Sequence, residues 1–172
     1  MGFFSQRVSR IQASPTISIT AKTKKLKQEG KKIIDFSAGE PDFDTPDNVK
    51  KAAIKAIQDG QTKYTPVNGT KELNEAIIKK FKRENDLIFE PDEITVGCGG
   101  KQVIYNALVA TIEKGDEIII PSPFWVSYPD ITLLVEGNPV VLDCSLENNF
   151  KINPQDLENK ITNRTKWIIL NS

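Results

Sequence analysis

The segment Glu93–Gln102, with the sequence EITVGCGGKQ, constrains the fold of this 172-residue chain more than any other. Its β-branched run predicts a short strand, its glycines predict a tight corner, and Val103–Ile112 predicts a helix directly afterwards. Glycines let the backbone approach a ligand, and the first N–H groups of a helix lack internal acceptors at its positive end. The order is typical of a phosphate site, but it also suits a tight corner that binds nothing.

The sequence of this corner does not match either of two common nucleotide-binding motifs. A dinucleotide-binding fingerprint requires a third glycine three residues after Gly99, where the chain has Gln102. A P-loop requires Ser or Thr after its Gly-Lys pair, and Gln102 again follows Lys101. The corner therefore predicts a phosphate ligand of another kind, or none.

Composition narrows the function further. The 23 basic and 23 acidic residues balance, so no overall field favours nucleic acid or a membrane as partner. The absence of histidine excludes a Ser-His-Asp triad, a Cys-His pair and a His-based zinc site, which leaves proton transfer to lysine, carboxylate, tyrosine or a cofactor. The two cysteines, Cys98 and Cys144, have no metal-site or disulfide spacing, so we expect no metal and a reducing, cytoplasmic setting.

Short apolar runs alternate with helical patterns along the chain. Runs without polar alternation predict an α/β fold, with a mainly parallel sheet covered by helices on both faces. Thr45 is expected to cap a helix that has Pro46 at its first position and stops at Gly60. Strands are expected at residues 33–36, 93–96, 116–120, 140–142 and 166–170. The other helices are expected at residues 16–29, 73–81, 103–112, 153–160 and part of 124–134.

Three residues outside the corner suit a ligand site. Trp125 follows an expected strand end and could stack on a flat cofactor ring, although tryptophans more often pack in a core. Tyr64, on a polar loop, is either a phosphate donor or an ordinary surface tyrosine. Gly39 either leaves room for a ligand against the backbone or simply makes a turn.

Four segments together resemble the fold-type-I, pyridoxal phosphate (PLP)-dependent aminotransferases of class I, particularly bacterial aspartate aminotransferases, some of which also use prephenate. The segments are AGEPDFDTP at 38–46, KYTP at 63–66, GGKQ at 99–102 and PFWVSYP at 123–129. The resemblance covers essentially the whole chain but less than half of a full-length member. It implies an incomplete three-layer α-β-α large domain at 46–172, preceded at 1–45 by an N-terminal arm and part of the small domain.

The resemblance also implies roles in binding the cofactor, pyridoxal 5'-phosphate. Gly100, Lys101 and Gln102 would bind its phosphate at the helix N-terminus, mostly by backbone N–H. Trp125 would stack on the pyridine ring and help contact the substrate carboxylate region. The Lys101 ammonium would also help bind the side-chain carboxylate of a dicarboxylate substrate.

Further implied roles concern the substrate and a second subunit. Gly39 would contact the amino-acid substrate through its backbone. Tyr64 would reach the phosphate of the neighbouring subunit's cofactor, so the complete site would require a homodimer. Gln12 departs from the pattern, because some relatives with prephenate activity carry a basic residue there.

The implied reaction is reversible amino transfer from L-aspartate to 2-oxoglutarate, giving oxaloacetate and L-glutamate. No lysine of this chain stands in the motif of the family's catalytic lysine, so no catalytic residue is assigned here. We therefore expect the N-terminal portion of an aminotransferase that does not transaminate alone. The alternative is a non-catalytic module that binds phosphate ligands or pairs with intact aminotransferase subunits.

Overall fold

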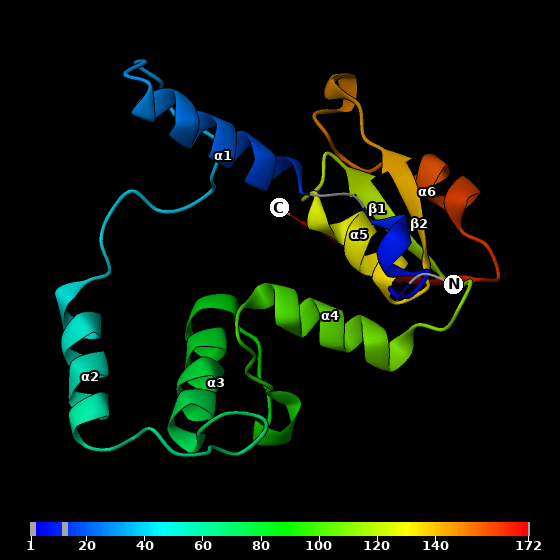
Figure 1. The fold of residues 1–172 in the computed structure, drawn as a ribbon. Coiled ribbons are helices and arrows are strands. Elements are labelled where there is room, and N and C mark those ends of the chain that lie inside the picture. The colour runs from blue at the N-terminus through cyan, green and yellow to red at the C-terminus, as the bar shows by residue number, and fades with distance from the viewer. Residues whose placement is uncertain (1–2, 12–13, 172) are drawn as a thin grey trace. The chain divides into compact units, whose positions relative to one another are not determined.

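The computed structural model describes residues 3–11 and 14–171, which divide into two compact units (Figure 1). One unit is built from the described parts of Met1–Ser37 and Ile104–Ser172, and the other is Ala38–Val103. Helix α4, Gly100–Thr111, begins in the second unit and ends in the first. No helix within the described ranges is long and apolar enough to cross a membrane.

The first unit is built on a parallel sheet of three strands in the order β2-β1-β3. The strands are β1 at Glu117–Ser122, β2 at Asn138–Asp143 and β3 at Thr165–Ile168. In the central strand β1, Ile118, Ile119 and Ile120 are all at most 1% exposed. Successive strand side chains point to opposite faces, so this run is buried on both sides of the sheet.

Helices cover both faces of this sheet. On one face, Ile118 and Ile120 pack in a cluster with residues from the end of α4 and from α5, Ser127–Leu134. On the other face, Ile119 packs with Leu142 and Cys144, and Leu157 of α6, Pro154–Lys160, packs against them. Figure 1 shows α5 and α6 beside the strands. The expected parallel α/β sheet with two covered faces is confirmed.

The N-terminal part of the first unit is mainly helical. A 3-10 turn at Val8–Arg10 precedes helix α1, Pro15–Gln28, on which only Thr23 is buried. An ion pair of 2.9 Å joins Lys27 Nζ to Asp35 Oδ2, and Thr20 Oγ1 lies 3.2 Å from Ser37 Oγ. These polar contacts tie the segment after α1 back to the helix.

The second unit carries α2, Asp47–Gln58, and α3, Lys71–Asn85, followed by a 3-10 turn at Pro91–Glu93. Thr70 caps α3 by accepting a hydrogen bond of 3.3 Å from the Leu73 N–H. Left-handed Asp86 ends the helix. With α1, α3, α4 and α6 placed, the helices expected at 16–29, 73–81, 103–112 and 153–160 are confirmed.

No strand forms at residues 93–96 or 33–36, so these two predictions are wrong. The backbone is extended at Ile94, but residues 94–97 form no strand, because a strand requires a ladder and the Val96 N–H instead donates to the carbonyl of Asn68 in a loop, at 3.1 Å. Residues 33–36 are irregular, with Phe36 92% exposed, so no packing favours a strand there. Apolar β-branched sequence alone did not distinguish an extended loop from a paired strand.

The start of α2 is also shifted from its expected place. Pro46 is the N-cap rather than the first helical residue, because its ψ of 143° is extended and the helix begins at Asp47. Thr45 is consequently not the cap. The predicted stop is confirmed, since α2 ends before Gly60, which has a left-handed φ of 75°.

Candidate functional site

The glycine corner, residues 97–102, is a tight turn that depends on two of its glycines. A Cβ at Gly97 would lie 2.7 Å from Cγ2 of Val103, closer than real Cβ atoms approach. Gly99 has a left-handed φ of 86°, which strains any other residue. Helix α4 begins at the next residue, Gly100. The predicted order of a tight glycine turn followed at once by a helix N-terminus is confirmed.

Hydrogen bonds within the corner fix its shape. The side-chain Oε1 of Gln102 accepts from the Cys98 N–H, and the Gly99 N–H donates to the Gly97 carbonyl at 2.9 Å. The Gln102 N–H donates to the Gly99 carbonyl at 3.2 Å. Gln102 therefore holds the corner closed with both its side chain and its backbone.

The loop-closing role of the Gln102 side chain was missed from the sequence. The signal that could have found it is the capping-box pattern, in which Glu or Gln at the third helical position reaches back to an N–H before the helix. Here Gln102 holds that third position, but Gly99 replaces the usual Ser or Thr cap. The pattern was therefore only half present.

Five of the predicted site residues lie in the second unit. Gly100, Lys101 and Gln102 form the first turn of α4 and are brought together by it. Gly39 lies on the loop before α2, where an added Cβ would meet nothing within 4 Å, so local packing does not demand glycine. Tyr64 lies on the loop between α2 and α3 and is fully exposed. Gln12 lies outside the described residues.

The sixth predicted residue, Trp125, lies in the first unit between β1 and α5. Its side chain is 38% exposed, so it is not a core tryptophan. Its ring meets that of Tyr128 edge to face, with centroids 5.3 Å apart and planes at 88°. Exposed indole surface beside a fixed aromatic neighbour can receive a flat ligand.

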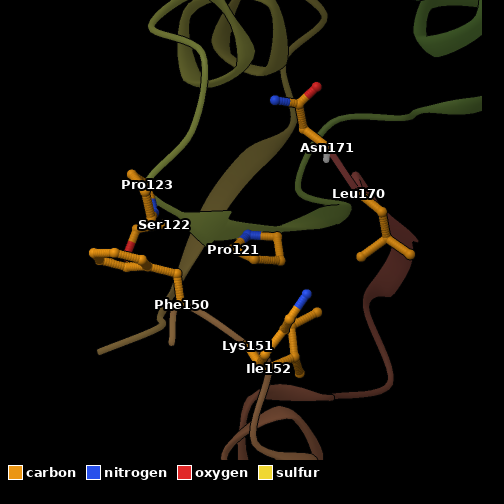
Figure 2. Close-up of a pocket in the computed structure, with 8 residues that line it drawn as sticks. All are labelled: Pro121, Ser122, Pro123, Phe150, Lys151, Ile152, Leu170 and Asn171. Carbon is orange, nitrogen blue, oxygen red and sulfur yellow. The ribbon is translucent and has the colours of Figure 1, made fainter. Parts of the chain in front are cut away.

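A pocket of about 510 Å³ opens at the carboxyl ends of β1 and β3 (Figure 2). Strand β1 is followed by β2 on one side and adjoined by β3 on the other, so the pocket lies where the strand order reverses, the usual ligand position in α/β sheets. Figure 2 shows the Lys151 ammonium directed between Pro121 and Leu170. The lining residues are Pro121, Ser122, Pro123, Phe150, Lys151, Ile152, Leu170 and Asn171.

Apart from Pro123, which belongs to the segment PFWVSYP, the pocket residues were not singled out from the sequence, although Asn171 directly follows a predicted strand end. At the β1 side, Ser122 Oγ lies 3.4 Å from Asp143 Oδ1 and accepts from the Cys144 N–H at 3.4 Å. These contacts join the carboxyl ends of β1 and β2. The β1 side of the pocket wall is thus held by the sheet.

Two carboxyl groups of the first unit have lowered pKa values. The pKa of Asp35 falls from 3.8 to about 2, because the Ser37 hydroxyl and then the Lys27 ammonium donate to the carboxylate. The pKa of Asp116 is lowered by the Glu113 N–H and then by Lys166. Both carboxylates accept hydrogen bonds from nearby loop residues.

Within residues 3–11 and 14–171, no group of three His, Cys, Asp or Glu side chains could hold a metal.

Comparison with protein families gives a match over most of the chain. The model of the family described as aminotransferase class I and II matches residues 31–172. The probable aspartate/prephenate aminotransferase of Rickettsia conorii is 56% identical over 172 residues, which are 100% of this chain and 43% of that protein. The aspartate/prephenate aminotransferase of Nitrosomonas europaea is 58% identical over 168 residues, 98% of this chain and 42% of that protein.

Solved structures agree with this match. The aspartate aminotransferase of Rhizobium meliloti superposes with a TM-score of 0.93 at 49% identity, over 99% of this chain and 43% of that one. The Thermus thermophilus aspartate aminotransferase with maleate gives a TM-score of 0.96 at 42% identity, over 100% of this chain and 45% of that one. The chain therefore spans a little under half the length of the relatives it matches.

Proposed function

The chain belongs to the class I and II aminotransferases, and from this premise we propose that it is the N-terminal portion of a PLP-dependent aspartate aminotransferase. The whole enzyme would transfer the amino group of L-aspartate to 2-oxoglutarate, giving oxaloacetate and L-glutamate. The observation that carries the proposal is the closed glycine corner, residues 97–102, at the start of α4. It is a preformed cradle for the cofactor's phosphate.

The residues of the corner fit a phosphate. Glycine at positions 97 and 99 gives the turn its shape, and α4 places a helix N-terminus directly after it. Gly100 and Lys101 would bind phosphate oxygens through backbone N–H groups, and Gln102 would keep the turn closed. The Lys101 ammonium would also attract the side-chain carboxylate of a dicarboxylate substrate.

The remaining site residues would bind and orient the cofactor and the substrate. Trp125 would present its exposed indole face to the pyridine ring, and Gly39 would contact the substrate through its backbone. PLP, when bound, supplies an electron sink for the charge left when the substrate loses its Cα proton. No lysine of this chain stands in the family's motif for moving that proton, so we propose that these residues bind and orient without transaminating.

A homodimer with a shared site is part of the proposal. Tyr64 is fully exposed on its loop, and Val67 on the same loop is 99% exposed. An exposed phenol beside exposed apolar surface suits a residue that reaches into a neighbouring subunit, here toward the cofactor phosphate. The alternative, a module that pairs with intact aminotransferase subunits, would use the same surface.

The domain division and the cellular location predicted from the sequence are also part of the proposal. Residues 1–45 are proposed as an N-terminal arm with part of the small domain, and 46–172 as the first part of the large PLP-binding domain. The cytoplasm is proposed as the location. Prephenate is left out of the proposed substrates, because Gln12 occupies the position where some relatives that use it carry a basic residue.

The experiment mixes the purified full chain with PLP or with pyridoxal, which lacks the phosphate, reduces with borohydride and maps the labelled peptides. The same samples are assayed with aspartate and 2-oxoglutarate. We expect tighter binding of PLP than of pyridoxal, no single stoichiometrically labelled lysine and no turnover. Equal binding of the two compounds would contradict the phosphate site. One stoichiometric labelled lysine together with turnover would contradict the assignment of a non-catalytic portion.

A further inference from the structure

Tyr128 is a buried aromatic side chain near the carboxyl ends of β1 and β3. It lies in the first turn of α5, is 7% exposed and belongs to the core cluster on one face of the sheet, with Ile118 and Ile120. Its carbonyl accepts from Oγ1 of the fully buried Thr132 at 2.9 Å. The core packing holds its ring, and this bond holds its backbone carbonyl.

This anchored ring holds Trp125. The Tyr128 N–H donates to the Trp125 carbonyl at 3.0 Å, which fixes the distance between the two backbones. The two rings are then perpendicular, at 88°, with centroids 5.3 Å apart, an arrangement that the aromatic quadrupoles favour. Trp125 thus rests on a buried neighbour while 38% of its own side chain stays exposed.

The hydroxyl of Tyr128 extends this contact to the neighbouring strand. It lies 3.5 Å from Oδ1 of Asn171, which follows β3 and lines the pocket of Figure 2. Tyr128 therefore touches one residue beyond the end of β1 and one beyond the end of β3. A separation of 3.5 Å is at the long limit for a hydrogen bond, so the ring contact dominates.

We propose that Tyr128 is a positioning residue that holds the Trp125 indole plane so that one face is presented to the planar ring of the cofactor. The inference rests on the stacking role proposed for Trp125. A flat ligand stacks only on a ring held in the matching plane, and a ring that is already fixed loses less freedom on binding. Tyr128 itself is buried and acts through Trp125.

The test uses the chain with Trp167→Phe, which leaves Trp125 as its only tryptophan. Tyr128→Phe keeps the aromatic edge, Tyr128→Leu removes it, and Tyr105→Leu, on α4, is the matched tyrosine control. Near-ultraviolet circular dichroism reports the Trp125 environment without cofactor. Quenching of Trp125 emission on titration with PLP gives the affinity.

We expect Tyr128→Phe and Tyr105→Leu to keep both the near-ultraviolet band and the PLP affinity. Tyr128→Leu should lose the band and bind PLP about fivefold more weakly, the size expected for one aromatic pair. Unchanged affinity in Tyr128→Leu, alongside quenching in the parent chain, would overturn the positioning role alone. Absence of quenching in the parent chain would instead overturn the proposed function, and with it the cofactor role of Tyr128.

A second measurement covers the case in which Tyr128→Leu does not fold. Time-resolved fluorescence anisotropy of the Trp167→Phe chain reports motion of the Trp125 indole directly. A ring held by Tyr128 should show no sub-nanosecond rotation of large amplitude beyond that of the unit itself. Free local rotation of the indole would overturn the proposal without any change at Tyr128.

Discussion

The backbone N–H of Cys98 donates a hydrogen bond to the side-chain Oε1 of Gln102, and this bond closes the glycine corner at the start of α4. The corner is thus shaped by its own chain before any ligand arrives. A preformed cradle binds an anion without first having to order its backbone, which favours affinity.

Gln102→Ala removes this bond and should loosen the corner. The loss of one hydrogen bond of about 1 kcal/mol predicts amide exchange at Cys98 about fivefold faster, measured by hydrogen exchange with NMR detection. Gln155→Ala, on exposed α6, is the control and should leave the Cys98 amide unchanged. Equal exchange rates in the parent chain and in Gln102→Ala would show that the bond does not hold the corner.

Two alanine substitutions within the corner should have different effects on the free energy of unfolding. Gly97→Ala places a Cβ 2.7 Å from Val103 Cγ2 and should destabilise the chain by about 1–3 kcal/mol, as overpacking does. At Gly100 a Cβ meets nothing within 4 Å, so Gly100→Ala should be neutral or stabilise α4 by up to about 1 kcal/mol. Thermal unfolding followed by circular dichroism measures both. Equal effects of the two variants would contradict the described turn.

The central strand should respond to truncation far more than the strand beside it. Ile119→Ala removes a side chain that is 1% exposed and should lower the free energy of unfolding by about 2–5 kcal/mol. Val141→Ala, on β2 and 36% exposed, should cost less than about 1 kcal/mol. Urea unfolding followed by the fluorescence of Trp125 and Trp167, the second of which packs against the core, compares them. A similar loss in both variants would be inconsistent with burial of β1 on both faces.

The parallel sheet was predictable because Ile118, Ile119 and Ile120 are apolar without alternation, which requires cover on both faces. The stretch at 93–96, Glu-Ile-Thr-Val, alternates polar and apolar residues and has no ladder partner among the described residues, because local sequence does not determine strand pairing. Apolar sequence therefore predicted both burial and pairing for the central strand, but neither at residues 33–36, where Phe36 is 92% exposed.

The candidate site was likewise predictable only in its local features. Glycine spacing and the following helix identified the corner, and Trp125 was identified from its place after a strand. The contact from Tyr128 to Asn171 joins residues 43 positions apart, so no local pattern could reveal it. The edge-to-face contact of Trp125 with Tyr128 joins residues three positions apart at the start of a helix. Side chains at that spacing commonly meet, so this contact could have been predicted from the sequence.

Acid should weaken the link between α1 and the segment after it. Hydrogen bonds from Ser37 and Lys27 lower the pKa of Asp35 from 3.8 to about 2. Because the folded-state pKa is depressed, the contribution of Asp35 to stability is fully present above pH 3.8. It is lost as pH falls from 3.8 through about 2.

NMR titration of the Asp35 carboxyl carbon should show this midpoint near 2. Asp35→Asn should remove the corresponding part of the acid sensitivity, while Asp92→Asn, on the 3-10 turn of the other unit, should not. A midpoint near 3.8 would mean that the Ser37 and Lys27 contacts do not persist in solution.

The central claim is that the glycine corner holds the phosphate of PLP, and backbone amide NMR of the full chain tests it most directly. The ¹⁵N-labelled chain is titrated with PLP and, in parallel, with pyridoxal. We predict large shifts of the Gly99, Gly100 and Lys101 amides with PLP, small shifts with pyridoxal, and loss of the difference in Gly97→Ala. Equal shifts with both compounds, or shifts that leave these amides unmoved, would contradict the account.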